Sequence, residues 1–314
     1  MRVQKLKIGI LEPSNFSEMA IEVLEKCGHI SKFDGRNLEL FLQDVQVLFV
    51  RLSYHIDFSF LNLAPKLQYV CSPTTGHNHL DVGKMKERGI SLISLRGHTE
   101  FLHNIRATPE HTFGLILALL RNYKIAFSHV GNGEWNRDKL RGEELYRKKV
   151  GIIGLGRVGK IVSQYCNIFG AIVSFYDIET FKYNNKLRKK NSVASLIEDS
   201  DIVVLCASHN KDSNLILGKN EIKLLSGKFF VNTARGELVD ESCLIEAIRS
   251  KHFAGVAIDV ISKELTIDNV KIWQKLSNEY DNLIVTPHIS GATIESMRET
   301  ELFIANELLR EINS

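Results

Sequence analysis

One stretch decides the fold prediction for this chain: VGIIGLGRVGKIVSQYCNIFGAIVSFYD (150–177). It opens with a short apolar run, typical of a strand buried on both faces, and a helix-length segment follows at once. Between them lies the pattern Gly154-x-Gly156-x-x-Gly159. Glycines there permit a tight turn, let a phosphate approach the backbone N–H groups at the helix start, and bring helix and strand close together.

Asp177 ends the next apolar run, 18 residues after Gly159. A carboxylate at this place accepts hydrogen bonds from ribose hydroxyls and repels a 2′-phosphate, so it favours NAD over NADP. The strand, the helix and the terminal Asp together favour a dinucleotide site. Methyltransferases and sugar-nucleotide enzymes use similar glycine turns, so the pattern alone does not define a reaction. A different cofactor such as S-adenosylmethionine is therefore an open alternative.

Similar apolar runs recur along the chain: KIGIL (7–11), VLFVR (47–51), LQYVCS (67–72), SLIS (91–94), DIVVLCA (201–207), KFFVNTA (228–234), VAIDV (256–260) and LIVTPH (283–288). Most intervals have room for a crossover helix, which predicts the α/β class with parallel sheets. Helices are expected over 19–24, 108–120 and 295–309, and the last two lie where they could bridge two domains. The basic run KLRKK (186–190) is interpreted as a solvated helix face.

Length and composition exclude several classes of protein. At about 150 residues per domain, 314 residues predict two domains. The net charge of +3 argues against nucleic acid or a membrane surface as partner, and no apolar run is long enough for a membrane span. Five cysteines without a CxxC pattern and an N-terminus without signal-peptide features predict a cytoplasmic protein. The histidines lack metal-ligand spacing, so no metal is expected.

Three polar residues, Arg235, Glu264 and His288, lie at or just beyond the ends of later apolar runs. The carboxyl ends of parallel strands line the ligand crevice, so these side chains are expected to converge beside a nicotinamide. An arginine can bind a carboxylate, a histidine can supply a proton, and a glutamate can orient the histidine. The alternatives are a surface arginine, a core histidine and a solvated glutamate.

At these residues the chain resembles the D-isomer-specific 2-hydroxyacid dehydrogenases, which include phosphoglycerate, glycerate and formate dehydrogenases. The resemblance runs from about Val47 to the C-terminus and is carried by GEWNRDKLRGEELYRKKVGIIGLGRVGK (133–160), FFVNTARGELVDESCLIEAI (229–248), GVAIDV (255–260) and VTPHISGAT (285–293). It implies two Rossmann-like domains with doubly wound parallel sheets. An NAD-binding domain, residues 101–288, is inserted in a flavodoxin-like substrate domain made of residues 1–100 and 289–314.

The resemblance also implies roles for individual residues. The catalytic residues are Arg235, Glu264 and His288. The NAD-binding residues are Gly154, Gly156, Arg157, Val158, Gly159, Asp177, Ala207, Ser208, Ser213, Thr233, Ala234, Asp259, Ser290 and Gly291. The residues that bind the 2-oxo or 2-hydroxy acid are Arg51, Thr75, Gly76, His77 and Asn78. Family members are commonly homodimers through the NAD domain, with 133–150 near the interface.

The sequence therefore predicts an NAD-dependent oxidoreductase that interconverts a small D-2-hydroxy acid and its 2-oxo acid. The alternative is a non-catalytic NAD(H)-sensing scaffold of the same fold, as in corepressors. Leu265 stands where relatives often have Pro, and Ser208 and Ser213 replace a Pro and a Thr. These departures leave the particular 2-hydroxy acid open.

Overall fold

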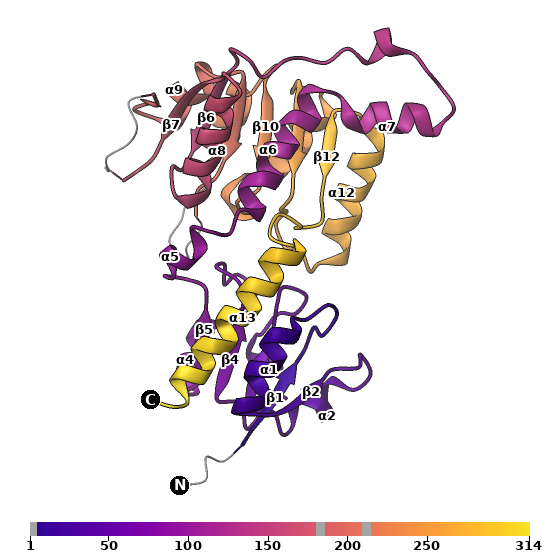
Figure 1. Ribbon diagram of the computed structural model, residues 1–314. Helices are drawn as coiled ribbons and strands as arrows, with labels where there is room; N and C mark the ends of the chain where they lie inside the picture. The colour runs from indigo at the N-terminus through magenta and orange to yellow at the C-terminus, as the bar shows by residue number, and fades with distance from the viewer. Residues whose placement is uncertain (1–4, 180–185, 209–214) are drawn as a thin grey trace. The chain divides into compact units, whose positions relative to one another are not determined.

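The computed structural model describes residues 5–179, 186–208 and 215–314, and the chain forms two compact units (Figure 1). Unit 1 comprises Met1–Ile105 with Ala292–Ser314, and unit 2 comprises Arg106–Gly291. The two junctions between the units follow Ile105 and Gly291. The junctions expected after residues 100 and 288 therefore lie five and three residues before the observed ones. Each unit is built on a sheet whose strand pairings are all parallel within the described residues, which confirms the predicted fold class.

Unit 1 contains a sheet with the strand order β2-β1-β3-β4-β5, the flavodoxin-like order of doubly wound folds. Its strands are β1 (Leu6–Ile10), β2 (Gly28–Lys32), β3 (Val47–Phe49), β4 (Tyr69–Ser72) and β5 (Ser91–Ser94). Its helices are α1 (Glu18–Cys27), α2 (Leu38–Leu42), α3 (Phe58–Asn62), α4 (Val82–Glu87), α5 (Thr99–Leu102) and α13 (Ile294–Glu311). Helices α1 and α13 share one apolar core, and α2, α3 and α4 share a second.

Unit 2 contains a sheet with the order β12-β11-β10-β9-β6-β7-β8. Its strands are β6 (Lys149–Ile153), β7 (Ile172–Tyr176), β8 (Arg188–Lys189), β9 (Ile202–Leu205), β10 (Phe229–Asn232), β11 (Gly255–Ile258) and β12 (Leu283–Val285). Its helices are α6 (Ala107–Leu120), α7 (Tyr123–Gly131), α8 (Arg157–Ile168), α9 (Val193–Glu198), α10 (Lys219–Leu224), α11 (Glu241–Arg249) and α12 (Ile267–Glu279), with 3-10 turns η1 (Arg137–Leu140) and η2 (Gly236–Leu238). The strand order reverses between β6 and β9, the switch point where such folds bind ligands.

Strand β10 shows why these runs are continuously apolar. Successive side chains of a strand point to opposite faces of the sheet. Phe229 and Val231 join the core that α6 and α8 cover, while Phe230 joins the core that α9 to α12 cover. Since both faces are buried, neither can be polar, and the alternation that would mark a half-exposed strand is missing from the sequence.

Two edge strands were not predicted. Helix α1 ends at Cys27 as the sequence suggested, but β2 begins directly at Gly28 with mostly exposed or half-buried side chains. The helix expected over 186–190 is wrong, because Arg188 and Lys189 form β8 and pair with β7. An edge strand exposes much of its surface, so its sequence does not need an apolar run.

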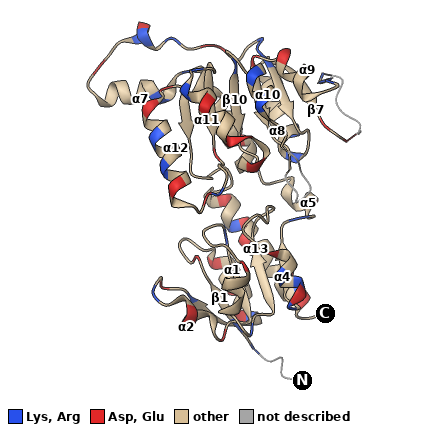
Figure 2. Ribbon diagram, turned by 180° about the vertical axis from the view of Figure 1, so that it is seen from behind, with Lys and Arg blue, Asp and Glu red and all other residues tan. Residues whose placement is uncertain are grey.

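Charges of both signs are interspersed on the outer helices, as α12 shows (Figure 2), which agrees with a net charge close to zero. All five cysteines are free; Cys27, Cys71 and Cys166 are buried as small apolar side chains would be, whereas Cys206 and Cys243 are half-buried. Burial raises the pKa of the Cys166 thiol to about 12. Within the described residues, no helix is both long and apolar enough to span a membrane.

Candidate active site

The glycine turn between β6 and α8 has the geometry of a phosphate cradle. Gly154 has φ of +89°, and a Cβ there would lie 2.6 Å from the Cα of Ala207. A Cβ on Gly159 would lie 2.1 Å from the carbonyl oxygen of Gly154. At Gly156 a Cβ would meet nothing within 4 Å, so the N-cap of α8 faces open space. Two glycines thus close the turn, and the third leaves its backbone accessible to a pyrophosphate.

Asp177 lies directly after β7 and is tied to the same turn. Its Oδ2 accepts the Leu155 N–H at 2.7 Å, and its Oδ1 accepts the Glu179 N–H at 2.9 Å. Arg157 is the first residue of α8, and both its burial and the nearby charge of Arg106 lower the pKa of its guanidinium. The cation of Arg157 at the start of α8 suits an anionic pyrophosphate, so the turn fits NAD.

Three loops meet at the carboxyl edge of the neighbouring strands β10, β11 and β12. The Asp259 N–H donates to the Asn232 carbonyl at 3.0 Å, and the His288 N–H donates to the Asp259 carbonyl at 2.9 Å. The Thr286 N–H donates to the Ile258 carbonyl at 2.9 Å. The segments that carry the predicted catalytic residues are therefore joined by backbone hydrogen bonds.

Glu264 and His288, which are 24 residues apart in the chain, are brought into direct contact. Nδ1 of His288 lies 2.6 Å from Oε2 of Glu264, and 22% and 31% of the two side chains are exposed. His288 has φ of +52°, a left-handed backbone that is uncommon outside glycine and often occurs at functional sites. Through Nδ1 the Glu264 carboxylate fixes the orientation of the His288 imidazole. The second ring nitrogen, Nε2, is not in this contact.

Asp259 holds the loop that carries His288. The residue is 1% exposed. Oδ1 accepts from the Thr286 hydroxyl at 2.6 Å and the Ile289 N–H at 2.9 Å, and Oδ2 accepts from the Ser290 N–H at 3.0 Å. Nε2 of His111, on α6, lies 3.4 Å from Oδ1. Burial raises the pKa of Asp259, but hydrogen bonds from His111, Thr286 and Ile289 and the charge of His111 outweigh it and lower the pKa to about 2.

Arg235 lies in a turn that the side chain of Asn232 organises. Oδ1 of Asn232 accepts the Ala234 N–H at 3.0 Å, and its Nδ2 donates to the Arg235 carbonyl at 3.1 Å. The next residue, Gly236, packs against the segment that leads to Glu264, because a Cβ there would lie 2.1 Å from the carbonyl carbon of Ile261. The Arg235 and Glu264 loops are therefore in backbone contact.

Of the other residues predicted to bind NAD, some are held by side-chain hydrogen bonds, some pack against their neighbours, and some are exposed. Thr233 is buried, with its hydroxyl 2.7 Å from that of Thr112 on α6, and Ser290 is held by Asp259. Ala207 packs against Gly154, Val158 packs on the core beneath α8, and Ser208 and Gly291 are exposed. Ser213 lies outside the described residues.

The predicted substrate residues lie in unit 1. Thr75, Gly76, His77 and Asn78 form the loop after the carboxyl end of β4, where Nε2 of His77 lies 2.9 Å from the Ser94 hydroxyl. Arg51, predicted to bind substrate, forms an ion pair with the buried Glu301 of α13, and its Nη1 also donates to the Ser14 carbonyl. In unit 1 the Arg51 guanidinium thus links the segment after β3 to α13. Its role toward a substrate stays a prediction.

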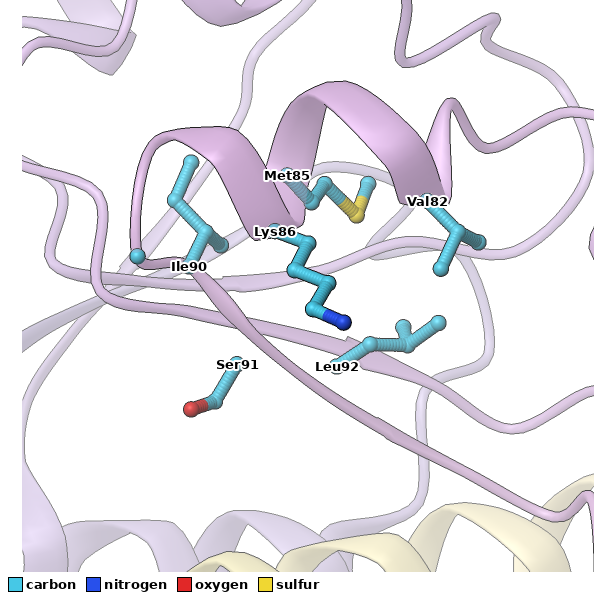
Figure 3. A pocket seen from close by; sticks show the side chains of 7 residues that line it. Val82, Met85, Lys86, Ile90, Ser91 and Leu92 are labelled. Atoms are coloured by element: carbon cyan, nitrogen blue, oxygen red, sulfur yellow. The ribbon is translucent and has the colours of Figure 1, made fainter.

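Unit 1 also has a shallow hollow of about 350 Å³, which is distinct from the predicted substrate loop 75–78. It is lined by Val82, Met85, Lys86, Gly89, Ile90, Ser91 and Leu92, and Lys86 extends toward Leu92 (Figure 3). It lies at the amino end of β5, whereas the 75–78 loop follows the carboxyl end of the parallel neighbour β4. Ligands of such sheets bind at carboxyl ends, so this hollow is not the candidate site.

Comparison with known proteins agrees with this geometry. Residues 113–290 match the model of the D-isomer specific 2-hydroxyacid dehydrogenase, NAD binding domain. D-3-phosphoglycerate dehydrogenase of Escherichia coli is 30% identical over 98% of this chain and 75% of that protein. The chain therefore belongs to the D-isomer specific 2-hydroxyacid dehydrogenase family, a family of NAD-dependent oxidoreductases, and contains its NAD-binding domain.

Solved structures show the same fold. An NAD-dependent formate dehydrogenase from Staphylococcus aureus superposes with a TM-score of 0.83 at 24% identity, covering 98% of this chain and 96% of that one. A D-lactate dehydrogenase from Aquifex aeolicus gives a TM-score of 0.82 at 24% identity, covering 98% and 95%. The predictions of the family and of NAD as its cofactor are confirmed.

Sequence reasoning missed several residues that organise the site. Asn232 and Thr286 lie inside quoted motifs, and Asn232 could have been found because an Asn before a turn often bonds the backbone two residues on. The sequence pattern assigned His111 no role, whereas it contacts Asp259 and Thr286. Among the described residues no group of three or more His, Cys, Asp or Glu is placed to hold a metal.

We predict that Asp259→Asn destabilises the protein by about 2 kcal/mol at pH 7. The folded-state pKa is lowered from 3.8 to about 2, so the charged carboxylate stabilises the fold above about pH 4, and this contribution is lost as the pH falls toward 2. Urea unfolding at pH 7, 5 and 3 measures the free-energy difference between variant and wild type. This free-energy difference should shrink at pH 3. A difference that does not change with pH would refute this account. An equally large difference for Asp281→Asn, at an exposed residue, would also refute it.

Proposed function

We propose that this protein interconverts a small D-2-hydroxy acid and its 2-oxo acid, with Arg235, Glu264 and His288 as its catalytic residues. The observation that carries the proposal is the 2.6 Å contact between His288 Nδ1 and Glu264 Oε2, at the carboxyl edge of the same sheet that carries the nucleotide cradle. NAD, when bound, accepts or supplies the hydride. The protein must therefore hold the organic acid and move one proton.

His288 is the proton donor when a 2-oxo acid is reduced. Glu264 occupies Nδ1, so the proton that passes to the C2 oxygen is held at Nε2. The carboxylate stabilises the positive imidazolium before transfer and fixes the ring in one orientation. In the reverse direction the same nitrogen takes the hydroxyl proton of the 2-hydroxy acid.

Arg235 binds the carboxylate of the organic acid. Its guanidinium offers donors in a fixed planar arrangement that matches a carboxylate, and its positive charge opposes that of the anion. The Asn232 turn and the contact of Gly236 with Ile261 fix its backbone relative to the Glu264 loop. We further propose that backbone N–H groups of the loop 75–78 in unit 1 take part in substrate binding.

The Escherichia coli relative acts, by its name, on 3-phosphoglycerate. The substrate here is tested with NADH and a panel of glyoxylate, hydroxypyruvate, pyruvate and 3-phosphohydroxypyruvate. With the best of these, His288→Ala should lower kcat by about 100-fold or more, because a general acid contributes at least that factor. Arg235→Lys should mainly raise KM, since it keeps the charge and loses the paired donors. Absorbance at 340 nm follows the reaction.

The control is NADH binding, measured by fluorescence, which both variants should retain. Turnover of none of the four acids, with NADH tightly bound, would contradict the proposal and favour the NAD(H)-sensing scaffold. Unchanged kcat in His288→Ala would refute its role as proton donor.

We infer that the protein is a homodimer through unit 2. Helix α7 contains no buried residue, and Figure 1 shows it and the following chain projecting from the rest of unit 2. Phe127 is 70% exposed and Trp135 is 89% exposed. The Lys124 ammonium anchors this helix, donating to the carbonyls of Tyr280 and Leu283 at 2.9 and 2.8 Å. Exposed aromatic side chains on one projecting segment are typical of an interface, and a second copy of this chain is the partner that the family suggests.

Sedimentation equilibrium tests the dimer. Phe127→Glu combined with Trp135→Glu should give a monomer, because two charges would be buried in the contact. Leu40→Glu, at an exposed residue of unit 1, should leave the dimer intact. A wild-type monomer at micromolar concentration, or dimers in every variant, would rule out this interface.

A further inference from the structure

A polar cluster next to the catalytic pair connects the loop of Glu264 to the helices α11 and α12. Its centre is the carboxylate of Glu241, the first residue of α11. Oε1 accepts the backbone N–H of Ser262 at 3.0 Å and the indole N–H of Trp273 at 2.9 Å. Nδ2 of Asn269 lies 3.2 Å from Oε2 and also donates to the carbonyl of Ser262. Both backbone groups of Ser262 are therefore occupied, two residues before Glu264.

We propose that Glu241 is a positioning residue that holds Glu264 against His288, an inference that rests on the proposed function. Glu264 itself lies in a short turn, where its Oε1 accepts the Ile261 N–H at 3.3 Å. Lys263, directly before it, has φ of +51°, a backbone that few non-glycine residues adopt. A turn with such a residue persists only when its surroundings fix it.

The surroundings fix the turn from two sides. On one side Gly236 packs so closely that a Cβ would lie 2.2 Å from the Ser262 nitrogen. On the other side Glu241 accepts the hydrogen on that nitrogen. Trp273 is 2% exposed and carries a single N–H donor, so its buried ring holds the Glu241 carboxylate in one place. Glu241 thus transmits the rigid packing of α12 to the Glu264 turn.

The test is a double-mutant cycle that compares wild type, Glu241→Ala, Glu264→Gln and the double variant. Glu241→Ala should lower kcat by about 10-fold, because a small displacement of Glu264 disturbs its contact with His288. In the Glu264→Gln background the same change should have less than about a twofold effect, since the group it positions is already lost. Glu241→Gln keeps an acceptor oxygen and should restore most of the activity. Glu246→Gln, at an exposed glutamate of the same helix, is the matched control.

A second measurement needs no substrate. The ¹⁵N chemical shift of His288 Nδ1 reports its hydrogen bond to Glu264. In Glu241→Ala it should move toward the value in Glu264→Gln, while Glu246→Gln should keep the wild-type value. Should Glu241→Ala fail to fold, Asn269→Ala frees the Ser262 carbonyl and should shift the signal in the same direction.

An equal loss of kcat in both backgrounds, or a wild-type ¹⁵N shift in both Glu241→Ala and Asn269→Ala, would overturn the inference. The proposed function fails separately, if Glu264→Gln itself leaves kcat unchanged. A wild-type kcat in Glu241→Ala beside an impaired Glu264→Gln would refute only the positioning role.

Discussion

The buried carboxylate of Asp259 is the interaction on which the candidate site depends. It lies just after β11, between the loops that follow β10 and β12, and it accepts hydrogen bonds from one hydroxyl and two backbone N–H groups of the loop around His288. A buried charge is tolerated only when it is paired and fully hydrogen-bonded. The loop must therefore close around the carboxylate, and this closure holds His288 in a backbone conformation that it would otherwise rarely adopt.

The proposed acid–base pair, His288 and Glu264, is held in place by two supports. His288 is held from the β12 side through Asp259, while the Glu264 turn is held from the α11 and α12 side through Ser262. The proposed chemistry needs a defined distance between Nδ1 and the carboxylate, and neither loop can fix that distance alone. In both supports a carboxylate, that of Asp259 or of Glu241, accepts backbone N–H groups of the loop. These hydrogen bonds keep the loops in shape in place of a helix or strand.

The sequence predicted the parallel sheets, the cradle and the family because each depends on local patterns. Buried strands must be apolar on both faces, and the turn after β6 requires glycine at Gly154 and Gly159. The edge strands β2 and β8 were not predicted. Each pairs with only one neighbouring strand and is only partly buried, so its sequence does not need to be apolar. Glu264 and His288 could be named from motifs, but their contact joins residues 24 positions apart. The links from Glu241 to Ser262 and from His111 to Asp259 depend on tertiary packing, which no local pattern encodes.

The central claim is that His288 delivers the proton while Arg235 holds the carboxylate. The most direct test is a crystal structure of the protein with NADH and oxamate, an unreactive analogue of a 2-oxo acid. The account predicts His288 Nε2 within about 3 Å of the analogue's carbonyl oxygen, its Nδ1 still on Glu264, and the carboxylate on the Arg235 guanidinium. An analogue bound beside NADH without contact to either Arg235 or His288 would contradict it.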